Sequence, residues 1–393
     1  MRYRRRAIGA IAILSLASVL LGFVSQVRGD DVRSRTPERP LLVYIGTYTT
    51  SEDQGIFIFR MDPASGALTR VGVAAGVANP SFLAIHPGGR YLYAVNEVGG
   101  YEGKKSGAVS AFAIDEETGE LTLLNRQASG GSSPCHIVVD SSGRNALVAN
   151  YGGGSVAVLR IGKDGRLGDR SSFVQHEGSS VNPRRQKGPH AHSINVDAGN
   201  RFAFAADLGL DKVLVYRFDA EKGTLTRHGA AAVKPGAGPR HFAIGPGGRF
   251  AYVINELAST VTAFSFDAER GRLRELQTVS TLPAGVDRPN STAEVQVAPS
   301  GKFLYGSNRG HDSIVVFSID AEKGTLKYVE NESTRGKTPR NFGIDPTGKF
   351  LLAANQGTDN VVVFRIDGET GALTPAGHEA RVPRPVCVKF LAR

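Results

Sequence analysis

The sequence has few cysteines and no concentrated basic face, and each shortage excludes a class of protein. It contains two cysteines in 393 residues, and no closed Cys/His spacing for a zinc site is present. The formal net charge is +10, but residues 1–29 hold five arginines and no acids, so the remainder carries +5. Because these remaining basic residues are scattered among turns, nucleic acid is not expected as a partner. A Gly-x-Ser-x-Gly motif is also missing, which argues against a serine nucleophile.

A turn phrase, Asp-x-x-x-Gly-x-Leu, recurs through the chain. It occurs at 62–68, 115–121, 219–225, 267–273, 320–326 and 367–373, with a degraded copy at 163–167. Short apolar strands that end in Asn or Asp lie between the copies, and from Asn96 to Asn355 these endings are 54, 57, 48, 53 and 47 residues apart. This period is typical of four-stranded propeller blades. We therefore predict an all-β fold, a single seven-bladed β-propeller over residues 41–393.

The two ends of the predicted propeller carry complementary, incomplete repeats. Residues 385–390 supply only a first strand, whereas residues 41–48 begin at a second strand. We expect them to pair as one blade shared between the N- and C-termini, which closes the ring and removes exposed sheet edges. Cys135 and Cys387 then fall in the first strands of blades that are not neighbours, so we expect buried free thiols and no mutual disulfide.

Residues 1–29 have the pattern of a secretory signal. Arginines at positions 2, 4, 5 and 6 precede an uncharged apolar run over residues 7–24, and a short polar linker follows at 30–40. No clear cleavage site stands out, so an uncleaved membrane anchor is the alternative. We expect an exported protein, periplasmic or extracellular, with membrane contact only if this segment is retained.

The repeat also locates a candidate site at one end of the central channel. Because neighbouring strands of a blade are antiparallel, the start of each first strand and the end of each second strand meet there. At the starts of the first strands, one ring contains Ser81, Cys135, His192, Arg240, Ala293 and Arg340, and the next ring contains Phe82, His136, Ser193, His241, Glu294 and Asn341. The residues that directly follow the ends of the second strands are Glu97, Tyr151, Leu208, Glu256, Arg309 and Gln356. A structural repeat would place similar residues at equivalent positions, but these are diverse and often ionisable. Convergent titratable groups in a concavity indicate a ligand or catalytic site.

Other repeated polar residues favour structural roles. The strand-end Asn side chains are expected to satisfy turn backbone, and Asp207 is kept as a candidate because it alone among them is charged. The Asp of the turn phrase is not expected to bind calcium, because one carboxylate per hairpin cannot supply about six to eight oxygens. The basic loop 184–187 is consistent with phosphate binding and equally with a solvated loop.

Seven motifs together resemble the seven-bladed lactonase family from about residue 41 to the end. They are Gly188–His192, Asp207–Gly209, Gly238–Phe242, Asn255–Leu257, Ser291–Glu294, Ser307–Gly310 and Ala354–Gly357. That family includes the bacterial propeller-type 6-phosphogluconolactonase and the fungal carboxymuconate lactonizing enzymes. The resemblance implies lactone hydrolysis and carries the proposed catalytic His, Arg, Glu and Arg of the fungal enzymes onto His192, Arg240, Glu256 and Arg309. The export segment is a departure from the family pattern, because 6-phosphogluconolactone is made in the cytoplasm.

This residue set suits opening of a sugar lactone. Arg240 and Arg309 would stabilise the negative charge that develops on the carbonyl oxygen, and Glu256 or His192 would take the proton from the attacking water. We assign substrate binding to His190, Asp207, His241, Glu294, Arg340 and Arg185. No metal or cofactor is expected. A lactonizing cycloisomerase and an exported noncatalytic ligand-binding propeller remain the alternative functions.

Overall fold

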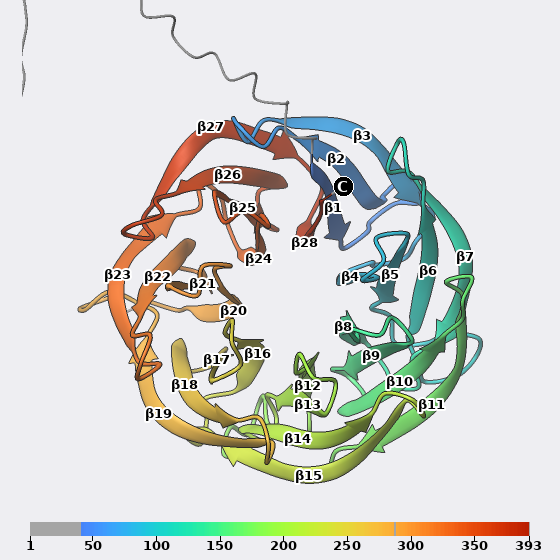
Figure 1. The fold of residues 1–393 in the computed structure, drawn as a ribbon, viewed down its shortest axis with the longest axis horizontal. Coiled ribbons are helices and arrows are strands. Elements are labelled where there is room, and N and C mark those ends of the chain that lie inside the picture. The colour runs from blue at the N-terminus through green and yellow to red at the C-terminus, as the bar shows by residue number, and fades with distance from the viewer. Residues whose placement is uncertain (1–40, 287, 393) are drawn as a thin grey trace, which may run out of the picture. The chain divides into compact units, whose positions relative to one another are not determined.

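The computed structural model describes residues 41–286 and 288–392. Every regular element in these ranges is a β-strand, and the 28 strands form seven four-stranded sheets arranged around a channel (Figure 1). The described residues therefore include no helix able to cross a membrane. The expected signal segment and linker lie outside the described residues. The prediction of a seven-bladed propeller is confirmed.

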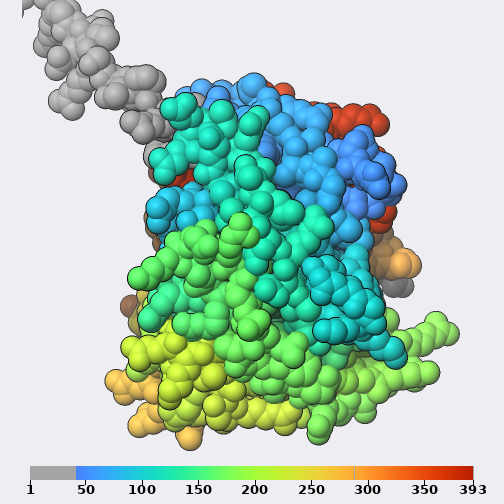
Figure 2. All heavy atoms as spheres, turned by 90° about the vertical axis from the view of Figure 1, so that its right-hand side faces the viewer, coloured from blue at the N-terminus to red at the C-terminus, as the bar shows by residue number. Residues whose placement is uncertain are grey.

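The strands are grouped into blades that follow chain order. From the channel outwards, blade 1 consists of β28 (Pro385–Leu391), β1 (Leu41–Thr47), β2 (Gly55–Met61) and β3 (Leu68–Ala75). Blade 2 consists of β4 (Leu83–Ile85), β5 (Tyr91–Asn96), β6 (Ala108–Ile114) and β7 (Leu121–Ala128). Blade 3 consists of β8 (Pro134–Val139), β9 (Asn145–Asn150), β10 (Ser155–Ile161) and β11 (Leu167–Gln175). Blade 4 consists of β12 (Ala191–Val196), β13 (Phe202–Asp207), β14 (Lys212–Asp219) and β15 (Thr224–Ala232). In side view, blades 2, 3 and 4 succeed one another along the outer wall (Figure 2).

The remaining three blades have the same order. Blade 5 consists of β16 (Pro239–Ile244), β17 (Phe250–Asn255), β18 (Thr260–Asp267) and β19 (Arg272–Ser280); blade 6 of β20 (Ser291–Val297), β21 (Phe303–Arg309), β22 (Ser313–Ile319) and β23 (Leu326–Ser333); blade 7 of β24 (Pro339–Ile344), β25 (Phe350–Asn355), β26 (Asn360–Ile366) and β27 (Leu373–Arg381). The first strand of blade 5 begins at Pro239, three residues before the apolar run at Phe242. Pairing of Pro239 with Asn255 extends the strand past an irregularity at Arg240.

Blade 1 closes the ring as the incomplete repeats predict. β1 pairs antiparallel with β28, with Val43 opposite Phe390 and Ile45 opposite Val388. Both cysteines are free and buried, in blades 1 and 3. The apolar core lies between adjacent blades, and the cluster around Val43 and Ile45 combines residues of blade 1 with residues of blade 7. Closure therefore completes a core as well as a sheet.

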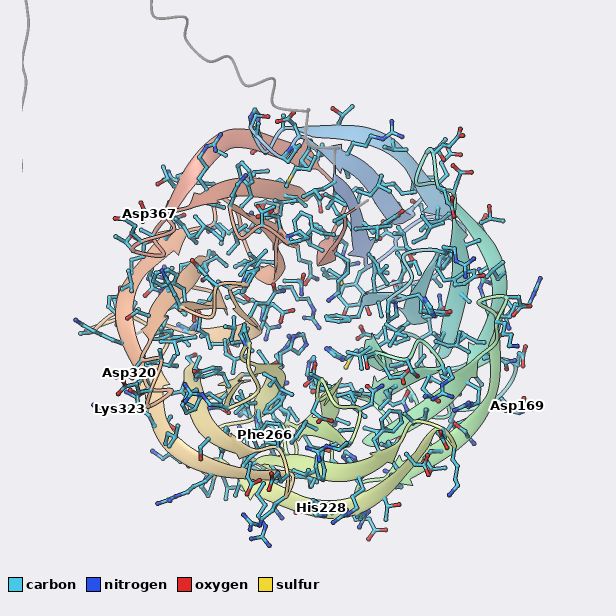
Figure 3. The ribbon with its side chains drawn as sticks, in the orientation of Figure 1. Asp169, His228, Phe266, Asp320, Lys323 and Asp367 are labelled. Atoms are coloured by element: carbon cyan, nitrogen blue, oxygen red, sulfur yellow. The ribbon has the colours of Figure 1, made fainter. Side chains whose placement is uncertain are left out.

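The turn phrase forms hairpin turns and also joins neighbouring blades. Asp62 Oδ1 accepts hydrogen bonds from the backbone N–H groups of Ala64 and Ser65 at 3.0 and 2.7 Å, and the other Asp residues of the phrase act in the same way. Two of them, Asp320 and Asp367, lie on the rim of the ring in Figure 3, away from the channel. These contacts confirm the turn assignment.

The glycine of the phrase accepts a hydrogen bond from a buried tyrosine of the preceding blade. Tyr93 Oη donates to Gly165 O at 3.0 Å, and the same contact joins Tyr44 to Gly119, Tyr252 to Gly324 and Tyr305 to Gly371. Gly165 has φ = 79°, and a Cβ there would lie 2.3 Å from the ring of Tyr91. Glycine is therefore required for both conformation and space. The two repeated phrases thus meet across each of these blade boundaries.

The strand-end asparagines of blades 2, 6 and 7 satisfy backbone groups, as their repetition predicts, whereas Asn255 of blade 5 donates to the hydroxyls of Thr260 and Thr262. Asn96 donates from Nδ2 to Ala78 O at 2.9 Å, Asn308 to Thr281 O at 2.9 Å and Asn355 to Thr334 O at 3.0 Å. In each case the acceptor lies in the segment just before the first strand of the same blade or at the end of the preceding blade. Their role is to hold the inter-blade connections.

Deletion of residues 384–393 should abolish cooperative folding. The deletion removes β28 and the buried side chains of Val386, Cys387 and Val388, each worth roughly 1.5–3 kcal/mol, and it exposes the edge of β1. The loss is comparable with the total stability of a typical domain, about 5–15 kcal/mol. Thermal unfolding followed by circular dichroism tests this, with deletion of residues 392–393 alone as the control. An unchanged melting temperature after the longer deletion would contradict closure.

Candidate active site

β-bulges aim the first-ring side chains. In blades 3, 4, 5 and 7 the pairing of the innermost strand with its neighbour skips one residue. The skipped residues are Cys135, His192, Arg240 and Arg340. A bulge leaves its extra residue outside the regular ladder and commonly redirects a side chain next to a functional site. The local backbone therefore explains why the same position in different blades supplies side chains to one place.

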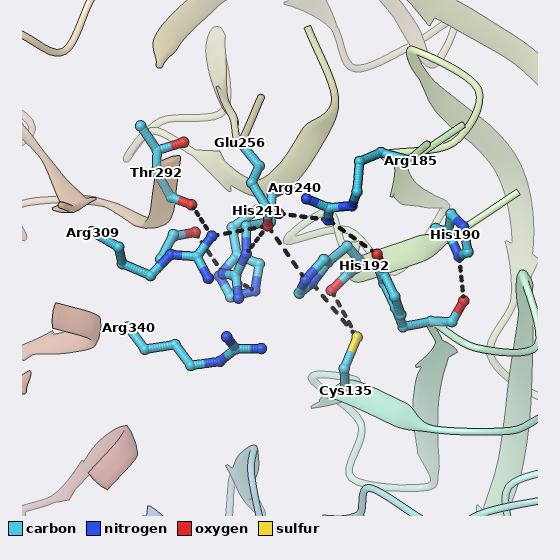
Figure 4. A network of polar contacts seen from close by, with 12 residues as sticks. Cys135, Arg185, His190, His192, Arg240, His241, Glu256, Thr292, Arg309 and Arg340 are labelled. Carbon is cyan, nitrogen blue, oxygen red and sulfur yellow. Dashed lines mark hydrogen bonds and ion pairs between the residues drawn. The ribbon is translucent and has the colours of Figure 1, made fainter. Parts of the chain in front are cut away.

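The four predicted catalytic residues converge on the carboxylate of Glu256 (Figure 4). Glu256 follows β17, and its Oε2 lies 3.0 Å from Arg240 Nε and 3.0 Å from Arg309 Nη2. Its Oε1 accepts a hydrogen bond from Arg185 Nη2 at 2.8 Å. His192 Nε2 lies 3.9 Å from Oε2, beyond hydrogen-bond range. We call Glu256, Arg185, Arg240 and Arg309 the arginine cluster.

The charges of the arginine cluster keep Glu256 ionised. Burial favours the neutral carboxyl group, but the positive charges of Arg309, Arg240 and Arg185 outweigh it and lower the pKa of Glu256 to about 2. Burial and the neighbouring charge of Arg240 lower the pKa of Arg309 to about 9. A single carboxylate thus faces three guanidinium groups, and the cluster has an excess of positive charge.

Three buried histidines adjoin this positive cluster and are neutral near pH 7. Burial, and secondarily the charge of Arg240, hold the pKa of His192 well below 6.5. The pKa values of His136 and His241 are lowered in the same direction, first by burial. Arg240 Nη1 lies 3.2 Å from His241 Nε2. Because arginine can only donate, His241 Nε2 is the acceptor, and the proton of the neutral His241 ring lies on Nδ1.

Two of the predicted binding residues, Arg185 and His190, lie on one side of the cluster, and a third, Arg340, lies on the other (Figure 4). Arg185 has a side chain that is 41% exposed, and its Nη2 also donates to Tyr151 Oη at 3.2 Å. His190 stacks on the Tyr151 ring with 4.6 Å between centroids. Arg340 donates to Tyr48 Oη at 3.0 Å and forms no ion pair with any residue in the described ranges.

Asp207 does not reach the site, contrary to the prediction that it binds substrate. Its side chain is fully buried, and Oδ2 lies 2.6 Å from His176 Nδ1. Tyr216 Oη contacts His176 Nε2 at 2.8 Å, and Asp207 Oδ1 accepts the backbone N–H of His190 at 2.8 Å. The Asp207 carboxylate is therefore part of a buried hydrogen-bond network with His176 and Tyr216, and it fixes the backbone of the loop that precedes β12.

His241 and Glu294 belong to the second ring, as the repeat predicts, and line a different cavity from the arginine cluster. Glu294 Oε1 accepts the Val295 N–H at 2.9 Å and lies 3.1 Å from His241 Nδ1, while Asn341 donates to Oε2. Burial raises the pKa of Glu294. Both residues line a cavity of about 510 Å³ together with Lys389. This cavity does not contain the arginine cluster, so we place the site at the channel mouth.

The recess at the mouth is bounded by residues to which the sequence assigned no role. Tyr48 Oη donates to Glu97 Oε2 at 2.8 Å, and Ser81 Oγ donates to the same atom at 2.5 Å. Tyr48, Glu97 and Cys135 line this recess, about 10 Å³ in volume, with His192, Arg240 and Arg340. A ligand larger than a water molecule would therefore lie above these side chains, toward the partly exposed Arg185 and His190. Tyr48 follows the second strand of blade 1, the position that Glu256 occupies in blade 5, so extending the repeat to blade 1 would have found it.

Comparisons with known proteins agree with this architecture. Residues 42–390 match the profile of the family described as "Lactonase, 7-bladed beta-propeller". The chain belongs to this family. The 6-phosphogluconolactonase of Bacillus subtilis is 40% identical over 348 residues, which are 88% of this chain and 97% of that protein. The lactonase family also includes a Formosa agariphila 6-phosphogluconolactonase that is 38% identical over 77% of this chain and 86% of its own. The structure of the Pseudomonas aeruginosa periplasmic gluconolactonase aligns with a TM-score of 0.83 at 34% identity, covering 90% of this chain and 99% of that one.

The stability of this lactonase-family propeller should fall as the pH drops below about 6.5. The folded pKa values of His136, His192 and His241 lie below the unfolded value of 6.5, so the unfolded state binds more protons in that window. The contribution of the neutral histidines to stability is fully present above pH 6.5. Below that pH the free energy of unfolding decreases by up to about 1.4 kcal/mol per pH unit for each histidine. Thermal melts from pH 8 to 5 measure it, and His136→Phe should flatten the slope. A melting temperature that is constant or rises on acidification would contradict the neutral histidines.

Proposed function

We propose that this protein hydrolyses sugar lactones of the gluconolactone type. The observation that carries the proposal is the arginine cluster, in which guanidinium groups and an ionised carboxylate lie beside the neutral His192 at a channel mouth. The names of the relatives, 6-phosphogluconolactonase and gluconolactonase, support the same chemistry. Arg240, Glu256 and Arg309 come from the motifs that carry the family resemblance, and Arg185 belongs to the basic loop 184–187.

The arginines have donors to offer to an oxyanion. Arg309 Nε is buried and has no hydrogen-bond partner among the described residues, and Arg240 uses Nε for Glu256 and Nη1 for Ala293 O at 2.7 Å. Donors that are already oriented stabilise charge as it develops on a carbonyl oxygen, because they need not reorganise during the reaction. We therefore propose that Arg309 and Arg240 donate hydrogen bonds to the oxyanion.

His192 is the better candidate for the general base. Glu256 is a weak base because its pKa is lowered to about 2, whereas the imidazole of His192 is neutral and can accept a proton near pH 7. The 3.9 Å between His192 Nε2 and Glu256 Oε2 leaves room for a water that donates to both. Glu256 then orients the water and offsets the charge of the imidazolium that forms.

The proposed reaction has two steps. Water attacks the lactone carbonyl carbon while His192 Nε2 takes one of its protons, and the carbonyl oxygen becomes an oxyanion beside the arginines. The carbonyl then re-forms as the ring C–O bond breaks, and the imidazolium returns its proton to the leaving ring oxygen. The product is the open-chain hydroxy acid, and the imidazole is regenerated.

The opposite wall is suited to a polyhydroxylated ring. Glu97 accepts a hydrogen bond from Tyr48, and Arg340 donates one to Tyr48 and lies over its ring. Arg340 has no carboxylate within ion-pair distance in the described chain. Comparison of kcat/KM on gluconolactone and on its 6-phosphate will show whether a phosphate adds to binding at this wall or at the basic loop 184–187.

We also propose that the protein acts outside the cytoplasm. The basic and apolar pattern of residues 1–29 supports export, and a structural relative is named a periplasmic gluconolactonase. An exported lactonase would meet unphosphorylated sugar lactones. Mass spectrometry of the mature amino terminus from a fractionated host distinguishes a cleaved signal from a retained anchor, and an intact cytoplasmic protein would contradict export.

Replacement of His192 by Gln should lower kcat on gluconolactone by about a hundredfold or more, the usual effect of losing a general base. Glu256→Gln should lower it by a similar factor, because the arginines and the imidazolium lose their counter-ion. Stopped-flow proton release measures both, with the exposed Glu120→Gln as a control of equal chemistry. A folded His192→Gln enzyme at the wild-type rate would remove His192 from the mechanism. Formation of a lactone from a muconate, without hydrolysis of sugar lactones, would favour the cycloisomerase.

Turnover should be unchanged by exhaustive dialysis against EDTA. The described residues contain no group of three or more His, Cys, Asp or Glu side chains placed to hold a metal ion, and the proposed oxyanion contacts come from arginine. The expectation of metal-independent activity stays a prediction. Loss of turnover that calcium or zinc restores would overturn it.

A further inference from the structure

Cys135 lies against the imidazole of His192 on the side opposite Glu256. Its Sγ is 3.6 Å from His192 Nδ1, 3.4 Å from His192 O and 3.7 Å from Ala191 O. Cys135 is the extra residue of the blade 3 bulge, and His192 is the extra residue of the blade 4 bulge. The two bulges thus bring a sulfur and an imidazole from neighbouring blades into contact (Figure 4).

Two arrangements satisfy these groups: the thiol donates either to His192 Nδ1 or to a backbone oxygen, and the shorter distance, 3.4 Å to His192 O against 3.6 Å to Nδ1, favours the second. Burial raises the pKa of the Cys135 thiol, so it is protonated and has one hydrogen to donate. The two backbone oxygens can only accept, and the closer of them, His192 O, takes the S–H. The lone pairs of the sulfur then remain to accept a hydrogen from His192 Nδ1. Sulfur is a weak acceptor, but no other described side chain has a hydrogen bond with Nδ1.

We propose that Cys135 is a positioning residue that fixes the tautomer of His192, with the proton on Nδ1 and the lone pair on Nε2. The bond that one ring nitrogen makes decides which nitrogen carries the proton. Nε2 is the atom that faces Glu256 across 3.9 Å. The base of the proposed reaction is therefore unprotonated at the atom that meets the water. The catalytic part of this proposal rests on the proposed function, whereas the tautomer does not.

The second buried thiol offers a matched control. Cys387 lies in β28, two blades from Cys135 along the ring, and its Sγ accepts the backbone N–H of Leu83 at 3.4 Å. Burial raises its pKa as well. Cys387 forms no hydrogen bond with a histidine in the described part of the chain, so Cys387→Ala measures the cost of removing a buried thiol without removing a hydrogen-bond partner of His192.

Long-range ¹H–¹⁵N NMR of histidine-labelled full-length protein tests the tautomer directly. The His192 signals are identified by their loss in His192→Gln. We expect the wild type to show a protonated Nδ1 and a bare Nε2, Cys135→Ser to keep this state because the hydroxyl can donate and accept in the same way, and Cys135→Ala to shift population to the Nε2–H form. A wild-type Nε2–H tautomer, or an Nδ1–H tautomer that persists in Cys135→Ala, would overturn the proposal.

Kinetics on gluconolactone test the catalytic consequence. Cys135→Ala should lower kcat by about tenfold, the range typical of lost outer contacts to a functional histidine, with KM changed less than about twofold because Cys135 does not hold the substrate in this account. Cys135→Ser should recover most of kcat, and Cys387→Ala should keep the wild-type value. An equal loss in Cys387→Ala, or no rescue by serine, would reduce Cys135 to a packing residue. If folded wild type shows no turnover while the NMR finds Nδ1–H, the proposed function fails and the tautomer assignment stands.

Discussion

The carboxylate of Glu256 is the charge on which the channel mouth depends. Arg185, Arg240 and Arg309 come from three different parts of the ring and meet at its two oxygens. Without that carboxylate, guanidinium groups would face one another in a largely buried space, and breaking such a buried pair typically costs about 3–5 kcal/mol. Burial first, and then the same excess of positive charge, lowers the pKa of His192 and keeps it neutral. In the proposed mechanism, this one ion cluster therefore determines which group can be the base and where an oxyanion can form.

The propeller makes this cluster possible by bringing remote segments to one axis. Each blade contributes only one or two residues, and the β-bulges at Cys135, His192, Arg240 and Arg340 turn those residues toward the mouth. Repeated contacts, such as Tyr305 to Gly371, fix the blades against one another. The repeated residues hold the ring, and the residues that differ between blades carry the chemistry. This division is physically necessary, because a tight ring of identical charges could not be buried.

The period of the repeats predicted the blades, the incomplete terminal repeats predicted their closure, and the antiparallel strand order predicted the convergence of His192, Arg240, Glu256 and Arg309. Antiparallel pairing alone placed strand starts beside strand ends, so backbone geometry carried that inference. The contacts of individual side chains could not be predicted in the same way. Two residues of β20, one of them Glu294, fall outside the ladder, and Asp207 turns toward His176, a residue in no repeat. The tautomer of His192 depends on atomic contacts that no spacing specifies.

The pH dependence of kcat/KM on a sugar lactone tests the central claim that His192 is the base beside a permanently ionised Glu256. The account predicts a constant rate from pH 8 to about 6.5 and a decrease at lower pH, as His192 takes up a proton at its lowered pKa. In His192→Gln the acidic decrease should disappear along with most of the activity. An acidic limb that survives unchanged in His192→Gln, but vanishes in Glu256→Gln, would assign the base to Glu256 and contradict the account.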